Sequence, residues 1–240
     1  MKQLIDIVTL LFTRAAPTTG MSTTESFVRM ILPWDPSFDA TMGLLALISL
    51  AAITLVVERF IYFGKRRVNA DKYFEKVKET FTTGGIPEVL ALVKNHDVPF
   101  AHVVRVAFEN YTLPDDMIAE MMESEILKQR VQMERFLAGI NTIGNVGPLM
   151  GLLGTVVGLI QAFLNIAVSG SGGPAVVAAG VGVALYTTEF GLVIAIPTIF
   201  FYNYFAKKST DIVDELETFL RKLMKLISLS KGGSYENPKA

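Results

Sequence analysis

The sequence contains no cysteine, only two histidines and few charged residues for its length of 240. Without cysteine, disulfides, thiolate metal sites and cysteine nucleophiles are all excluded. His96 and His102 stand on a polar stretch, where solvated or locally packed side chains are favoured over a metal pair. Charged residues make up 19% of the chain, below the roughly 25% of soluble domains. The net charge of −1 gives no electrostatic reason to expect a nucleic-acid partner.

Catalytic motifs are also missing. The glycine-rich stretch GNVGPLMGLLGTVVG lacks the lysine that a phosphate-binding loop needs. The sequence offers no serine–histidine–acid set and no pair of carboxylates placed to share a pocket. We therefore predict that the chain is not an enzyme and carries no cofactor.

Hydrophobic residues dominate instead, at 51% of the chain. Between Arg135 and Lys207 lie 71 residues, and Glu189 is the only Asp, Glu, Lys, Arg or His among them. A membrane-spanning helix needs about 20 residues, so this stretch can cross a membrane twice. The run at 41–63 offers a third span. The predicted fold class is an all-α integral membrane protein, with three transmembrane helices and long cytoplasmic helical extensions.

Positive residues predict the orientation. Segment 64–139 carries 11 lysines and arginines, whereas the turn SGSGGP carries none. Positively charged loops stay in the cytoplasm, so we expect the N-terminus outside and the C-terminus inside. The predicted segments are a periplasmic amphipathic segment 1–40, transmembrane helix 41–63, cytoplasmic helical region 64–139, transmembrane helix 140–168, periplasmic turn 169–174, transmembrane helix 175–206, and cytoplasmic C-terminal helix and tail 207–240.

Turn residues divide the cytoplasmic region into helices. TTGGIP (82–87) and LPDD (113–116) are typical breaks. The helix after the second break has the composition to run without interruption into the second span. An amphipathic helix is expected from Lys208 to about Ser228. Glu58 and Arg59, near the end of the first span, are expected to reach the membrane interface.

Small residues recur along one face of each hairpin span, and such faces let membrane helices approach closely. Two interpretations remain open: the faces pack the hairpin against itself, or they line a pore or grip a helix of another chain. Two prolines add kinks or freed carbonyls. The positions are Gly147, Pro148, Gly151, Gly154 and Gly158 in the second span, and Gly180, Ala184, Thr188, Gly191, Ala195 and Pro197 in the third.

The stretches GPLMGLLGTVVGLIQAF and ALYTTEFGLVIAIPTIFFYN resemble the paired signature of the ExbB/TolQ proton-channel family, which is related to the MotA stators. The resemblance implies an inner-membrane homopentamer around a pair of single-span ExbD/TolR-type partners. In that family a membrane aspartate of the partner carries the ion, and its passage drives a motor that delivers work to the cell envelope. By resemblance, Thr155 and Thr188 are pore-facing.

Two positions depart from the family pattern. Many members carry a glutamate where this chain has Val183. In this chain the only acidic residue of the second and third spans is Glu189, directly after Thr188. Three roles for Glu189 remain open. It faces the pore and relays ions, it pairs with a neighbouring subunit or with Tyr186, or it lies near the cytoplasmic end of the span and contacts water. Thr187 replaces a common alanine and adds a hydroxyl that sodium could use, although a proton remains the preferred ion.

Two other classes of function compete with the motor. A self-contained channel or transporter is disfavoured by the single acidic residue and by the lack of internal repeats. A passive membrane scaffold would use the glycine faces for packing alone. The partner's outer domain would decide whether the motor serves outer-membrane uptake, envelope maintenance or gliding.

Overall fold

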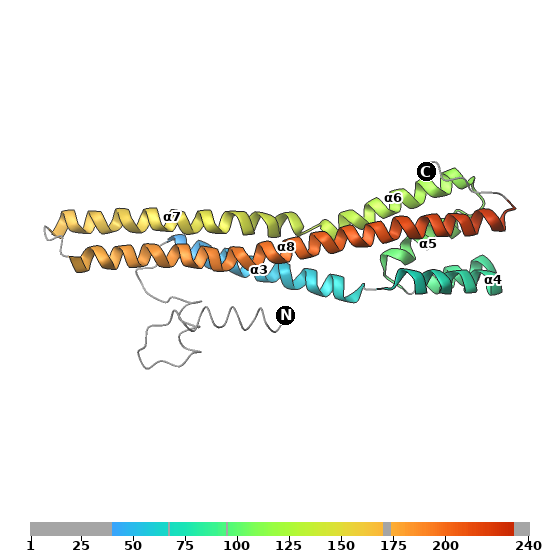
Figure 1. Ribbon diagram of the computed structural model, residues 1–240, viewed down its shortest axis with the longest axis horizontal. Helices are drawn as coiled ribbons and strands as arrows, with labels where there is room; N and C mark the ends of the chain where they lie inside the picture. The colour runs from blue at the N-terminus through green and yellow to red at the C-terminus, as the bar shows by residue number, and fades with distance from the viewer. Residues whose placement is uncertain (1–39, 67, 95, 170–173, 233–240) are drawn as a thin grey trace, which may run out of the picture. The chain divides into compact units, whose positions relative to one another are not determined.

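The computed structural model describes residues 40–66, 68–94, 96–169 and 174–232, which form helices labelled α3 to α8 and contain no strand (Figure 1). The expected outer segment before residue 40, positions 170–173 of the expected turn, and the tail after residue 232 lie outside this description. The helices are α3 (Ala40–Lys65), α4 (Ala70–Lys94), α5 (Pro99–Glu109), α6 (Asp115–Glu134), α7 (Leu137–Ser169) and α8 (Pro174–Ser230).

Three helical stretches are long and apolar enough to cross a membrane, namely Thr41–Gly64, Asp115–Val168 and Ala184–Ser230. The first two contain the expected spans 41–63 and 140–168, and the third overlaps the expected span 175–206 from residue 184 onward. Apart from Glu189, the charged residues of the last two stretches lie before residue 136 and after residue 206. The predicted class, an all-α membrane protein with three membrane helices, is therefore confirmed.

Both expected breaks occur. Within α4, Gly85 has the non-helical angles φ 71° and ψ −162°, and a positive φ of this kind suits glycine because it has no Cβ. α6 begins directly after Pro114, with Asp115 and Asp116 in its first turn, where the helix dipole favours negative charge.

The structure differs from expectation at two other junctions. α6 ends at Glu134 and α7 begins at Leu137, so Arg135 and Phe136 interrupt the helix that we expected to continue into the second span. Conversely, α8 runs from Pro174 to Ser230 in one piece. The third span and the amphipathic C-terminal helix, which we expected as separate segments, are therefore one element.

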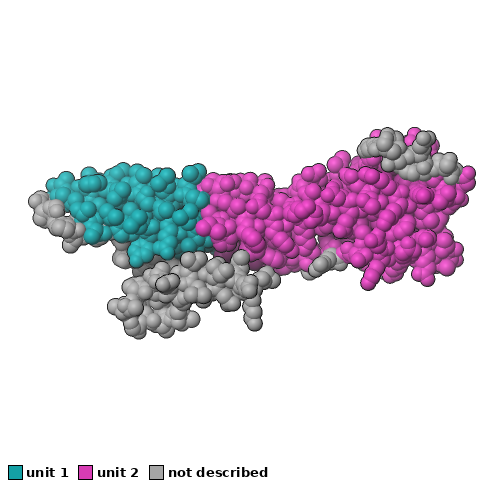
Figure 2. Space-filling model, in the orientation of Figure 1, with its two compact units in different colours: residues 1–51, 147–194 teal, residues 52–146, 195–240 magenta. Residues whose placement is uncertain are grey.

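The chain forms two compact units, shown in different colours in Figure 2. One unit contains residues 1–51 and 147–194, and the other contains residues 52–146 and 195–240. α3, α7 and α8 each contribute residues to both units. The hairpin positions from Gly147 to Gly191 all belong to the first unit, which therefore contains the candidate ion-pathway residues Thr155, Thr187, Thr188 and Glu189.

The second unit has an aromatic and aliphatic core. The apolar stripe expected on the C-terminal helix is buried there, including Leu216, Phe219 and Leu223. The ring of Phe219 lies 5.3 Å from that of Phe100 in α5. Burying each such side chain contributes about 1.5–3 kcal/mol, which explains why the end of α8 stays helical and packs against α4 and α5.

Candidate ion-pathway site

α7 and α8 touch along their backbones in the first unit. A Cβ atom added to Gly151 would lie 2.9 Å from the Thr187 carbonyl oxygen and 3.0 Å from the Thr188 Cα. A Cβ added to Gly191 would lie 2.7 Å from the Gly147 carbonyl oxygen. These separations leave no room for a side chain, so the glycines allow the two helices to meet. The small-residue faces therefore pack the hairpin against itself at these positions.

Thr187 fills the next part of this seam. Its side chain is 1% exposed, and its Cβ and Oγ1 lie 2.6 Å from where a Cβ of Gly154 would be. Its hydroxyl donates a hydrogen bond of 2.7 Å to the Ala184 carbonyl. One turn further out, a Cβ on Gly158 would meet that of Ala184 at 3.3 Å. Thr187 thus occupies the helix interface.

Thr188 and Thr155 lie at one level of the hairpin. The Thr188 hydroxyl donates a 3.2 Å hydrogen bond across the seam to the Gly151 carbonyl. In an α-helix that same carbonyl accepts the backbone N–H of residue 155. The Thr155 hydroxyl donates to the Leu152 carbonyl at 2.7 Å. Both side chains are half-buried. Because each hydroxyl donates its proton to a carbonyl, the hydroxyl oxygen can still accept a hydrogen bond from another group.

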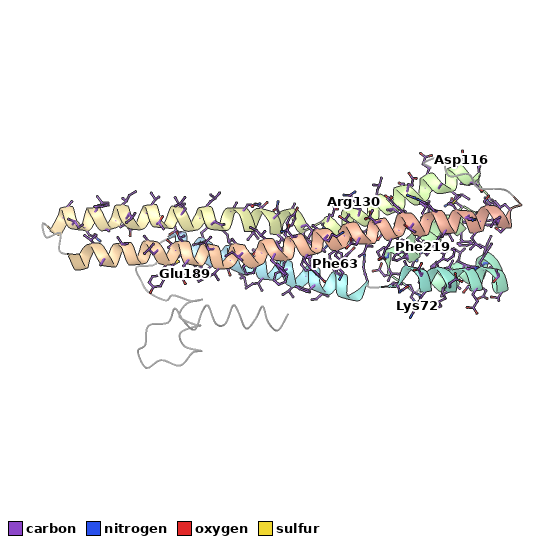
Figure 3. The ribbon with its side chains drawn as sticks, in the orientation of Figure 1. Phe63, Lys72, Asp116, Arg130, Glu189 and Phe219 are labelled. Carbon is purple, nitrogen blue, oxygen red and sulfur yellow. The ribbon has the colours of Figure 1, made fainter. Side chains whose placement is uncertain are left out.

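Glu189 points elsewhere. Glu189 is exposed, and Figure 3 shows its side chain on the side of α8 away from α7. Leu185 and Leu192, one turn on either side, are 65% and 42% exposed. No hydrogen bond joins Glu189 to Tyr186, which is itself 60% exposed. The only acid of the hairpin therefore lies on an apolar face that the described residues leave exposed.

The two prolines lie inside continuous helices. Pro148 stands within α7 and Pro197 within α8, and both are half-buried. A proline has no N–H, so each leaves the carbonyl four residues earlier, at Gly144 and Val193, without its usual helical partner. Ala195, the last of the predicted small-residue positions, is 1% exposed.

Sequence reasoning missed Gly144. A Cβ added there would lie 2.6 Å from Cγ1 of Ile199, so this glycine permits close contact of α7 and α8 within the second unit. Its signal was present in the sequence, because Gly144 precedes Gly147 by three residues and extends the alternating spacing of the glycine series.

The position of Arg59 also differs from expectation. We expected it to reach the membrane interface, but it is 2% exposed. Its Nη1 donates to the carbonyls of Gln132 and Met133 at 3.2 and 3.0 Å, and its guanidinium lies 5.0 Å from the Phe136 ring centroid. Arg59 therefore binds the last carbonyls of α6 directly before the break at 135–136. It also pairs with its neighbour Glu58.

The histidines are locally paired. His102 Nε2 lies 3.0 Å from Asp97 Oδ1, and His96 Nδ1 lies 2.8 Å from the Leu92 carbonyl. The hydrogen bond with His102, together with nearby Arg66, holds the pKa of Asp97 below its usual value although partial burial opposes the shift. Within the described ranges, no group of three or more His, Cys, Asp or Glu side chains is placed to hold a metal ion.

Comparison with known proteins agrees with this arrangement. The profile of the MotA/TolQ/ExbB proton channel family matches residues 95–218. A putative biopolymer transport protein ExbB homolog of Methanothermobacter thermautotrophicus is 29% identical over 193 residues, covering 80% of this chain and 68% of that protein. The biopolymer transport protein ExbB of Neisseria meningitidis is 27% identical over 206 residues, covering 79% of this chain and 91% of that protein.

The fold is similar to that of the flagellar MotAB stator complex from Bacillus subtilis, with a TM-score of 0.61 and 16% identity, covering 93% of this chain and 87% of that chain. At this identity the likeness concerns the fold alone. The family profile, in contrast, spans more than half of the sequence and includes the hairpin with its glycine seam and paired threonines. The chain therefore belongs to the MotA/TolQ/ExbB proton channel family.

Proposed function

We propose that this chain is the stator-like subunit of a proton-driven rotary motor in the bacterial inner membrane. Five copies surround a pair of single-span ExbD/TolR-type partners and transmit energy to the cell envelope. The observation that carries the proposal is the placement of Thr155 and Thr188 at one level of a glycine-packed hairpin. Membership of a proton channel family and the ExbB relatives support it.

The threonines act as acceptors in this mechanism. No aspartate occurs in 41–63 or 136–206, so an aspartate that carries the ion must come from the partner chain. When protonated, a carboxyl group is a hydrogen-bond donor, and the oxygens of Thr155 and Thr188 can accept from it. When the proton leaves toward the cytoplasm, that donor is lost. The protonated and the deprotonated aspartate therefore interact differently with the threonines, and this difference would move the partner relative to the ring of five copies.

Glu189 is assigned to a contact with another chain. A carboxyl group exposed to lipid is costly, and membrane carboxylates face a partner or a wet cavity. Its position away from α7 places this contact outside the hairpin seam. There it relays ions or pairs with a donor of the neighbouring subunit.

We expect Glu189→Gln to lower motor output at least tenfold while the complex still assembles, because the amide keeps the shape but cannot take up a proton. Output is measured as the partner-dependent envelope function in cells, with assembly checked by co-purification. Gln161→Asn, which keeps an uncharged amide on the other hairpin helix, controls for a general effect of substitution in the spans. Unchanged output in Glu189→Gln would remove the relay role.

The preferred ion is the proton. Sodium requires several oxygen ligands at short range, and the extra hydroxyl of Thr187 was the reason to consider it. That hydroxyl lies in the buried seam against Gly154 and donates to Ala184, which supports a packing role. Output that follows the sodium gradient and survives a protonophore would reverse this assignment.

The deciding experiment is a native mass measurement of the detergent-purified chain, co-expressed with the small single-span protein encoded beside it. We expect five copies of this chain carrying two partners. A monomer or dimer that ignores the partner would favour a passive scaffold. Ion flux through the purified chain alone would favour a self-contained channel. Either result would overturn the motor.

A further inference from the structure

A groove of about 960 Å³ opens beside the end of α3, in the second unit. One wall is the apolar stripe Ile53, Val57 and Ile61, spaced four residues apart, with exposed fractions of 59%, 49% and 52%. These residues lie within the candidate span Thr41–Gly64. The stripe is therefore at the depth of lipid hydrocarbon, where an acyl chain can lie along it.

The groove ends in charged and polar groups. Arg66 donates to Asp97 Oδ2 at 2.8 Å and to the Tyr62 hydroxyl at 2.7 Å. Glu58 also lines the groove and keeps 41% of its side chain exposed while it pairs with Arg59. His96 is exposed at the same end. The groove thus has an apolar wall and a polar end at Arg66, His96 and Asp97, which follow the predicted span 41–63, while Glu58 lies within that span.

The charges at this end have both signs. Besides the Tyr62 hydroxyl, its ionisable lining consists of one arginine, one histidine and two carboxylates. A headgroup with only negative charge would meet the two carboxylates at short range, which is unfavourable. A headgroup with a phosphate and an ammonium group finds an opposite charge for each, because arginine binds phosphate well and carboxylates accept from ammonium.

We propose that this groove binds one phospholipid whose headgroup carries a phosphate and a primary ammonium, as in an ethanolamine phospholipid. The acyl chain lies along Ile53, Val57 and Ile61. The phosphate binds at Arg66 and His96, and the ammonium binds at Asp97. The site is independent of the motor, because it uses no residue of the α7–α8 seam.

Native mass spectrometry of the purified full-length chain tests the site, after equilibration with equal amounts of ethanolamine, glycerol and choline phospholipids of identical acyl chains. We expect the ethanolamine lipid to be retained over the other two. Val57→Trp fills the apolar wall, and we expect it to lower this retention about tenfold through the loss of chain contacts. Ile53→Trp is a second, independent block. Leu47→Trp changes a residue that is 65% exposed on the same helix outside the groove, and retention should not change.

Asp97→Asn tests recognition of the headgroup. It removes one carboxylate charge with little change in shape, so the preference for ethanolamine over choline lipid should fall several-fold. Equal retention of all three lipids by the wild-type chain, or the same retention in both groove-filling variants, would show ordinary annular lipid and overturn the site. Loss of oligomers in these variants with no lipid bound would place another copy of the chain in the groove, which also overturns it.

Discussion

At the scale of single residues, Thr187, Thr188 and Glu189 follow one another on α8 but differ in burial and in contacts. Thr187 points into the seam and is 1% exposed. Thr188 reaches the Gly151 carbonyl, and Glu189 lies on the opposite, exposed side. Successive helical residues point about 100° apart, so Thr187 is buried in the seam, Thr188 is half-buried beside it, and Glu189 lies outside it.

Gly154→Ala should destabilise the hairpin. The added Cβ would lie 2.6 Å from Cβ and Oγ1 of Thr187, so the helices must separate. Overpacking of this kind typically lowers the free energy of unfolding by about 1–3 kcal/mol. The measurement is the unfolding free energy in detergent micelles. Gly182→Ala is the matched control, because nothing lies within 4 Å of a Cβ at that position. Equal stability of both variants would contradict the seam.

Asp97 should give the helical region between the first two spans an acid-sensitive contribution to stability. Its hydrogen bond with His102, followed by Arg66, holds the pKa of Asp97 below its ordinary 3.8. A carboxyl whose folded pKa is lower than its unfolded pKa stabilises the fold above the unfolded value. That contribution disappears as the pH falls through the folded value.

We therefore expect wild type to melt at a higher temperature than Asp97→Asn at about pH 6, and the gap to close as the pH falls below about 4. The effect should be modest, because the Asp97 side chain is 72% exposed and solvent weakens such pairs. Thermal unfolding at a series of pH values measures it. A gap that stays constant into acid would mean that Asp97 acts through shape and not through charge.

At the scale of elements, the break between α6 and α7 is stabilised from a third helix. Arg59 on α3 donates to the last carbonyls of α6, at Gln132 and Met133. The final carbonyls of any helix lack intrahelical partners, and a buried end needs a donor from elsewhere. The position of the break is thus tied to a residue more than seventy positions earlier in the sequence.

Arg59→Met should lower the free energy of unfolding by about 2–4 kcal/mol, since it leaves buried carbonyls without a donor and removes the partner of Glu58. Denaturant unfolding in micelles measures this. Arg130→Met is the control: Arg130 pairs with Glu134 on the surface, where both side chains are 50% and 42% exposed, and such pairs contribute about 0–1 kcal/mol. If both variants lose the same stability, Arg59 does not hold the helix end.

At the scale of the whole molecule, the chain is built to work with others. Leu185, Leu192 and Glu189 on α8 are exposed, and the described part of the chain does not cover them. No aspartate lies in the predicted spans. The charge distribution predicts that 64–139 and the segment after residue 206 face the cytoplasm, because lysines and arginines concentrate there.

The absence of native cysteine makes this orientation easy to test with single cysteines and a membrane-impermeant maleimide on spheroplasts. Ser171→Cys, in the turn predicted to be periplasmic, should be labelled in intact spheroplasts. Ser124→Cys, on the exposed side of α6, should be labelled only after lysis. The reverse pattern would invert the topology.

The sequence alone determined the three apolar helices, the breaks at TTGGIP and LPDD, the hairpin and the register of its glycines. These features depend on local hydrophobicity, turn residues and helical period, which can be read without distant contacts. Tertiary structure alone decided that Thr187 is buried, that Glu189 faces away from α7, that Arg59 caps α6, and that α8 continues to Ser230. Each of these depends on which side of a helix meets another helix, and that choice is made by packing between residues far apart in the chain.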